Sequence, residues 1–311
     1  MEAADIINQT VEIATLPEVT LRIIEVVQDP RSTAHDLHKI VSNDPALSAR
    51  VLRVVNSAFY GLPGQIGSID RAIMMLGLNA VKNIAIAASL AKMFKKGAIC
   101  DDFTGKDLWT HSVAVGATNK LITNAIGLAL PDEAFLAGLI HDLGLVAIMQ
   151  SQSQKLLEIV QMAKAGIPFR KAEDQVLGTN HQEICMALAA KWKFPRSFQY
   201  VTGYHHNPTD LARENRLLAM VTHVSDLLSS QKQFGITLTV ETEEISAEAL
   251  EEIGLTRGQL DEIQTLIEEE LESKAKLLRA IQLGLLAAII LISLFTVWML
   301  RHRLVQPLAQ L

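Results

Sequence analysis

The sequence predicts an all-α protein, in which a helical bundle is followed by one transmembrane helix near the C-terminus. Hydrophobic residues make up 49% of the 311 residues but aromatic residues only 5%, and the 17 Gly and 9 Pro are few. The apolar mass therefore comes from Leu, Ile, Val and Ala, a composition that favours helices. No alternating strand pattern of useful length occurs, apart from the short ITLTV at 236–240.

Residues 1–100 are expected to form an N-terminal helical subdomain. Apolar residues recur there at helical spacing, and a Ser/Thr cap and the pair Asp44-Pro45 are typical of helix starts. A segment rich in Gly and turn formers, NSAFYGLPGQIGSI, separates the earlier helices from the last helical run. The expected helices cover Val11–Val27 with a break at Leu16-Pro17, Ser32–Val41, Ala46–Val55 and Ile69–Phe94.

Residues 101–235 are expected to form a second helical subdomain with clearer boundaries. Asp107–Ala125 is one amphipathic helix that ends at Gly127. Pro131 starts another, because proline fits the first turn and the acidic residues after it face the positive end of the helix dipole. Asn180, followed three residues later by Glu183, indicates a further capped helix start.

Residues 241–279 are expected to form an acidic helical stalk. Between Glu241 and Ser273 the chain carries 12 acidic residues and a single basic residue, Arg257. Ser246–Leu278 is amphipathic, with a break at Gly254, and its acidic face is expected to be solvated.

Residues 280–300 contain no charged residue and are long enough, at 1.5 Å per residue, to cross the ~30 Å hydrocarbon layer. Basic residues flank this segment on both sides, and Trp298 lies near its far end, where an aromatic ring would sit at the interface. Met1–Asp5 has no base and resembles no signal peptide, so the main domain is expected to stay in the cytoplasm. The short basic tail at 301–311 is similar to the start of a HAMP linker. We expect this similarity to be accidental, or the chain to be a fragment of a longer protein.

Charge and cysteine content exclude several classes of protein. The net charge is -6, but the first 100 residues carry 10 bases against 9 acids, so no basic surface for nucleic acid is expected. The segment Ser42–Asn56 could pass for a helix-turn-helix, yet Arg50 and Arg53 are too few bases to contact phosphates. The two cysteines, Cys100 and Cys185, exclude a disulfide scaffold and a zinc ribbon.

Six of the nine histidines lie between residues 111 and 223, where the helix signals are cleanest. Imidazole and carboxylate are ligands that a divalent metal ion takes in proteins. The ordered set is more informative than any single histidine, and it consists of His111, His141-Asp142, His181, His205-His206 and Asp226.

These residues stand in motifs that resemble the HD superfamily of metal-dependent phosphohydrolases: His111-Ser112, GLIHDLG at 138–144, NHQEI at 180–184, YHHNP at 204–208 and VTHVSD at 221–226. Further motifs are more similar to the HDOD family, the HD-related output domain of bacterial signalling proteins. They are TLPEV at 15–19, NDPALSARVLRVVNSAFYG at 43–61, IGSIDRAIMMLGLNAVKNI at 66–84 and KWKFP at 191–195. The resemblance covers roughly residues 10–270 and implies an HDOD-type bundle whose HD-like half is 101–235.

The resemblance also implies a metal site with one or two divalent ions, iron, manganese or magnesium. His111, His141, Asp142 and Asp226 would hold the first ion, and His181, His205 and His206 would complete a second position. In HD-GYP relatives, which hydrolyse cyclic di-GMP, the corresponding residues hold metal ions that activate water; if this chain is active, the resemblance implies that His141 and Asp142 are its catalytic residues. Those relatives have a Lys where this chain has Leu145, and Asn207-Pro208-Thr209 replaces their Gly-Tyr-Pro loop.

Two functions follow from these observations. The first is a signal-transduction module, tethered to the bacterial inner membrane by one pass at 280–300, that acts through signalling proteins without catalysis. The second is a metal-dependent phosphohydrolase acting on a cyclic dinucleotide. Leu145 argues against the enzyme, because it removes a cation suited to the phosphate, whereas the complete ligand set argues for it.

Overall fold

The computed structural model describes residues 3–9, 18–29, 31–56, 60, 62–95, 98–101, 103–240 and 244–267. The chain divides into two units, residues 1–260 and 261–311. The predicted membrane segment at 280–300, the end of the stalk and the tail at 301–311 lie outside the described residues.

The all-α prediction is confirmed for the described residues. The helices before residue 100 are α1 (Ala3–Gln9), α3 (Glu18–Gln28), α4 (Ala34–Ser42), α5 (Pro45–Val55), α6 (Ile69–Leu76) and α7 (Leu78–Leu90). The later helices are α8 (Gly105–Ala125), α9 (Pro131–Ile140), α10 (Leu143–Ser151), α11 (Ser153–Lys164), α12 (Phe169–Leu177), α13 (His181–Lys191), α14 (Arg196–Tyr204), α15 (Leu217–Gln231) and α16 (Ala247–Ile253). Residues 257–267 are also helical.

Helix starts follow the capping signals in the sequence. Thr33 caps α4 with Asp36 in a reciprocal capping box, and Asp44 accepts from the backbone N–H of Leu47 ahead of the proline that opens α5. Asn180 caps α13 by accepting from the backbone N–H of Glu183. Each cap satisfies a helical N–H that would otherwise lack a partner.

One local prediction is wrong. The helical run from Ile69 to Phe94 is broken at Gly77, whose φ of +87° is readily adopted only by glycine, so that α6 ends before α7 begins. At 236–240 the sequence left a strand and a loop edge open, and the segment is a loop with turns. The strands within the described residues lie elsewhere: β1 (Ala98–Cys100) pairs antiparallel with β2 (Phe103–Thr104). Alternation over five residues is too short to decide between a strand and a loop.

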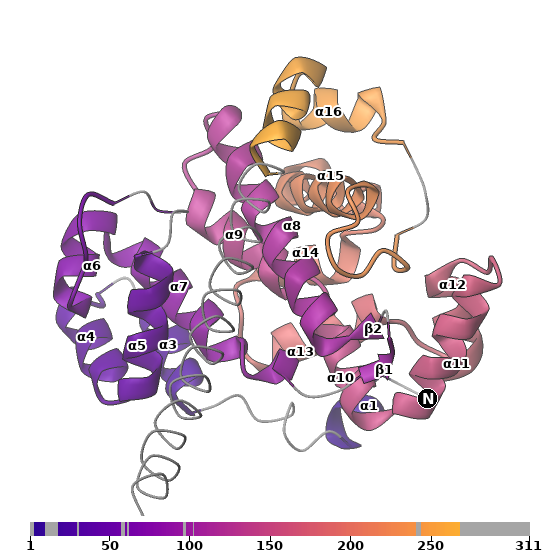
Figure 1. Ribbon diagram of the computed structural model, residues 1–311, viewed down its shortest axis with the longest axis horizontal. Helices are drawn as coiled ribbons and strands as arrows, with labels where there is room; N and C mark the ends of the chain where they lie inside the picture. Colours follow the sequence, from indigo (N-terminus) through magenta and orange to yellow (C-terminus); the bar gives the residue numbers. More distant parts are fainter. Residues whose placement is uncertain are drawn as a thin grey trace, which may run out of the picture. The chain divides into compact units, whose positions relative to one another are not determined.

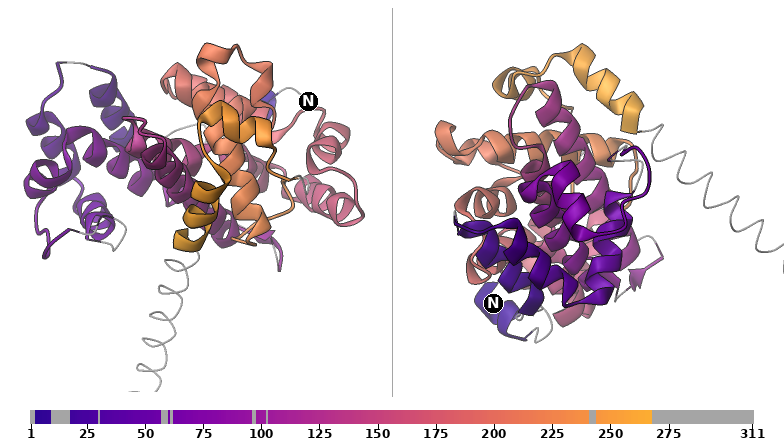
Figure 2. Two further views of the ribbon diagram at one scale, coloured as in Figure 1. Left: turned by 90° about the horizontal axis from the view of Figure 1, so that it is seen from above. Right: turned by 90° about the vertical axis from the view of Figure 1, so that its left-hand side faces the viewer.

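Helix α7 connects the helices that precede it in the chain with the later helices that begin at α8. Every residue from Val81 to Leu90 is buried, because α7 packs against α3, α5 and α6 on one side and α9 on another. Figures 1 and 2 show α3–α7 gathered on one side of α8 and α9, and the α11–α12 hairpin on the other. A helix that is buried all round carries few polar residues, as the sequence of α7 does.

Helices α8 and α9 approach each other closely through two glycines. A Cβ added at Gly138 would lie 2.7 Å from the Cα of Gly116, so neither position has room for a side chain. This contact brings the C-terminal end of α9, where the His-Asp pair follows, against the middle of α8.

One apolar stretch of the described chain, Pro131–Ser151, is long and apolar enough to cross a membrane. It comprises α9, the His141-Asp142 pair and α10, and 83% of its apolar 18-residue window is buried inside the protein.

Candidate metal centre

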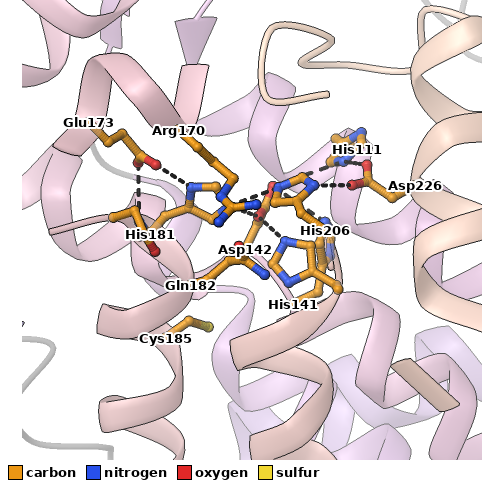
Figure 3. A network of polar contacts seen from close by, with 12 residues as sticks. His111, His141, Asp142, Arg170, Glu173, His181, Gln182, Cys185, His206 and Asp226 are labelled. Atoms are coloured by element: carbon orange, nitrogen blue, oxygen red, sulfur yellow. Dashed lines mark hydrogen bonds and ion pairs between the residues drawn. The ribbon is translucent and has the colours of Figure 1, made fainter. Parts of the chain in front are cut away.

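The structure brings together all seven residues that the sequence nominated as metal ligands, although they come from distant parts of the chain. Figure 3 shows most of their side chains converging. They are His111 on α8, His141 and Asp142 at the turn between α9 and α10, His181 at the start of α13, His205 and His206 after α14, and Asp226 on α15.

These ligand atoms form two adjacent groups, in each of which all atoms lie within 4.8 Å of one another. One group consists of His111, His141 and Asp226, and the other of Asp142, His181, His205 and His206. We call the two groups together the His/Asp cluster.

Asp142 lies between the two groups. Its Oδ2 is 3.3 Å from Nε2 of His141 and 4.0 Å from Nε2 of His111. Its Oδ1 is 3.4 Å from Nε2 of His205 and 3.6 Å from Nε2 of His181. The sequence placed this carboxylate in the first site, whereas the geometry has one oxygen facing each group.

Four of the imidazoles are oriented by a contact on the ring nitrogen away from the cluster. Nδ1 of His111, His141 and His205 faces the carbonyl oxygens of Phe234 (3.3 Å), Gly138 (2.6 Å) and Val201 (3.2 Å), and Nδ1 of His181 faces Glu173. A carbonyl oxygen only accepts, so the first three rings donate from Nδ1 and, when neutral, turn the lone pair of Nε2 towards the cluster. Metal-binding histidines show this arrangement.

Several buried polar atoms of the cluster have no hydrogen-bond partner within the described chain. They are Nε2 of His111, His141 and His205, both carboxylate oxygens of Asp142, and Oδ1 of Asp226. His111 Nε2 and Asp226 Oδ1 are 3.0 Å apart, and when Nδ1 of His111 carries the proton both of these atoms are acceptors. Because unpaired buried polar atoms are costly, and these converge on common points, the donor set fits one or two divalent cations.

The charges of the cluster depend on burial and on the central carboxylate. Burial lowers the pKa of His141, but Asp142 and Asp226 outweigh it and raise that pKa to about 9. Burial lowers the pKa of His205 to about 4. Burial raises the pKa of Asp142, but His141, His205 and His181 hold it well below its usual range. At neutral pH the cluster therefore offers an ionised Asp142 carboxylate and a neutral His205, and His141 would give up a proton if it served as a metal ligand.

Glu173 on α12 also belongs to the site, and it was not among the residues predicted from the sequence. This carboxylate is fully buried; Oε2 is 2.6 Å from Nδ1 of His181 and Oε1 accepts from the backbone N–H of the same residue. A signal for it exists in the sequence, because Glu173 shares the apolar face of α12 with Phe169, Ala172 and Leu177. An acid on the apolar face of an amphipathic helix needs a buried partner.

We expect Glu173→Gln to weaken metal binding about 10–100-fold, because the amide cannot accept from both N–H groups of His181 and leaves the ring poorly oriented. The measurement is a titration of manganese into chelator-treated protein. Glu158→Gln, on the exposed face of α11, is the matched control and should bind as the wild type does. Equal affinity in all three proteins would show that Glu173 has no role in orienting His181.

Comparison with known proteins agrees with this architecture. The family model of the HDOD domain matches residues 13–208. An uncharacterized protein of Treponema pallidum (strain Nichols) is 27% identical over 207 residues, which are 66% of this chain and 40% of that protein. The chain therefore spans less than half the length of this curated relative.

Solved structures of similar proteins share the fold. An HDOD domain protein with unknown function from Geobacter sulfurreducens is 26% identical, with a TM-score of 0.71 over 89% of this chain and 95% of that one. A candidate phosphohydrolase from Shewanella amazonensis SB2B is 23% identical, with a TM-score of 0.68 over 86% of this chain and 94% of that one.

Proposed function

Since this chain belongs to the HDOD domain family, we propose that it is a signal-transduction module that holds one or two divalent metal ions and acts through protein partners at a membrane. The main support for the proposal is the His/Asp cluster. Its seven side chains come from residues 111–226 of the chain and meet in the interior.

The donor set favours iron or manganese over magnesium. Five imidazoles and two carboxylates surround the two positions, and magnesium prefers oxygen ligands and retains water, whereas iron and manganese accept imidazole nitrogen. A bound divalent ion would polarise a phosphate oxygen and lower the pKa of a coordinated water. The protein contributes the orientation of its ligands through the Nδ1 contacts and the exclusion of water by burial.

Burial and the residue at position 145 favour regulation over catalysis. Six of the seven cluster residues are fully or almost fully buried, and the side chain of His206 keeps only 10% of its surface exposed. Leu145 is fully buried among the apolar residues of α10, so this position offers a phosphate no charge. Catalysis would require an opening through which the substrate reaches both ions. It would also require cationic side chains that stabilise the negative charge of the transition state.

Anchoring at the bacterial inner membrane through 280–300 and recognition of signalling proteins complete the proposal. Support for the anchor is the charge-free length of that segment with basic residues on both sides. Under this arrangement the domain lies in the cytoplasm, where a partner or a cyclic dinucleotide can reach it; no nucleic acid is expected.

The test is the metal content of the full chain, purified in detergent without chelator or affinity metal. We expect one or two equivalents of iron or manganese per chain, and no hydrolysis of cyclic dinucleotides when either metal is supplied in excess. A folded protein that holds no metal and gains no thermal stability on adding one would refute the proposal.

Metal-dependent hydrolysis is the second candidate function, and the complete ligand set favours it. Turnover of a cyclic dinucleotide that is lost in His141→Ala would replace the regulatory proposal with the enzymatic one. The same measurement on metal-loaded wild type therefore decides between the two.

A further inference from the structure

The His/Asp cluster is closest to solvent, within the described chain, at His206. Its side chain is 10% exposed, whereas the side chains of the other six residues are at most 2% exposed. The next residue, Asn207, is half-buried, and so is Arg170 of α12. A ligand that reaches the cluster without unfolding a helix would therefore pass beside these three residues.

Arg170 is held in place at this edge. One Nη1 hydrogen donates to Oδ1 of Asn207 at 3.1 Å, and the amide of Asn207 in turn donates to Asp210. Arg170 lies one helical turn before Glu173, so α12 directs both residues to the same side of the cluster. Figure 3 shows the Arg170 side chain extending towards His181 and His206.

Arg170 lacks an acidic partner of its own. The described residues place no carboxylate within ion-pair distance of it, and its Nε is buried without a hydrogen-bond partner. A guanidinium always carries its charge and presents several N–H donors in one plane, a shape that matches the oxygens of a phosphate.

We propose that Arg170 binds the phosphate group of a small phosphoester ligand at the exposed edge of the metal-loaded His/Asp cluster. Arg170 supplies from α12 the cation that α10 lacks at Leu145, and its bond to Asn207 orients it for this role. The inference rests on the proposed function, because it requires a cluster that holds metal. It assigns the recognition of phosphate to a residue outside the predicted ligand set.

The experiment uses the full chain in detergent, loaded with manganese, and inorganic phosphate as the probe. Metal content is measured first for the wild type, Arg170→Gln, Arg170→Lys and Lys171→Gln. Lys171 is the matched control, because it is the next residue on α12, carries the same charge and is exposed. Phosphate is then titrated by calorimetry, and metal content is measured again to show that phosphate has not extracted the ion.

We expect all four proteins to hold the same amount of manganese. Arg170→Gln should raise the Kd for phosphate at least about tenfold, because a charged hydrogen-bond donor is lost. Arg170→Lys should fall between Arg170→Gln and the wild type, since a lysine keeps the charge but loses the planar donor geometry. Lys171→Gln should bind phosphate as the wild type does.

Each other outcome overturns the inference. A metal-loaded wild type that binds no phosphate, or an Arg170→Gln protein with wild-type affinity, refutes it while the proposed function stands. Loss of manganese from Arg170→Gln would mean that Arg170 supports the metal ligands. If Lys171→Gln weakens phosphate binding as much as Arg170→Gln does, the effect comes from the overall positive charge and not from Arg170. A wild type that takes up no manganese fails at the first step and refutes the proposed function together with the inference.

Discussion

Replacing Asp142 with Asn is expected to weaken metal binding strongly in both groups of the His/Asp cluster at once. The two carboxylate oxygens face different groups, with Oδ2 3.3 Å from His141 and Oδ1 3.6 Å from His181. An asparagine side chain has the same size but offers one oxygen and one NH₂ group, which donates hydrogen bonds and cannot bind a cation. We expect the affinity for manganese to fall by at least about 100-fold. This exceeds the effect expected for Glu173→Gln, because Glu173 only orients a ligand, whereas Asp142 is a candidate ligand itself.

Three measurements make this result specific. Manganese content after purification and a manganese titration give the affinity, and far-UV circular dichroism shows that the helices persist in Asp142→Asn. Asp101→Asn removes an exposed carboxylate outside the cluster and should leave binding unchanged. Retention of one full equivalent of manganese by Asp142→Asn would mean that the groups bind independently and that Asp142 bridges nothing.

Gly144→Ala adds a single methyl group, yet it should be among the most destabilising substitutions in this protein. A Cβ at Gly144 would clash with the backbone carbonyl of His181, and a backbone atom at a helix start cannot move aside by changing rotamer. Alanine is otherwise the better helix former, so the substitution would gain up to about 1 kcal/mol without the clash. We expect a net loss of about 3 kcal/mol in the free energy of unfolding, as in an overpacked core.

Thermal unfolding of the metal-free protein measures this effect, with an expected fall in Tm of about 6–12 °C for a domain of this size. Gly258→Ala is the control, since its Cβ would meet no atom within 4 Å. It should keep or raise the Tm. Because the clash displaces His181 itself, Gly144→Ala should also weaken metal binding, and a variant as stable as the wild type would mean that α10 and α13 are not in contact as described.

Much of the fold follows from local signals that the sequence displays. The starts of α4, α5 and α13 are fixed by side chains within three residues of the cap, at Thr33, Asp44 and Asn180. The seven candidate ligands could also be nominated, because their residue types and order resemble a known motif series. Both kinds of signal consist of a few neighbouring residues, so they can be recognised without knowing the fold.

What could not be predicted depends on contacts between distant segments. The position of Asp142 between two groups of histidines is set by how α9 packs on α8 and α10 on α13. Glu173 and Arg170 are ordinary charged residues of a short helix until α12 is placed beside His181 and Asn207. The break at Gly77 was hidden because a glycine inside an apolar run gives no sign of its backbone angles.

The ligands of the His/Asp cluster are spread from residue 111 to residue 226, and this spacing governs when the centre can form during synthesis. A ribosome adds Asp226 before it reaches the predicted membrane segment at 280–300. The complete ligand set therefore leaves the ribosome ahead of the segment that we propose as a membrane anchor, and metal insertion would precede attachment through that segment. A chain that stops before residue 226 lacks the carboxylate nearest to His111, Asp226 at 3.0 Å, and its ligand set is incomplete.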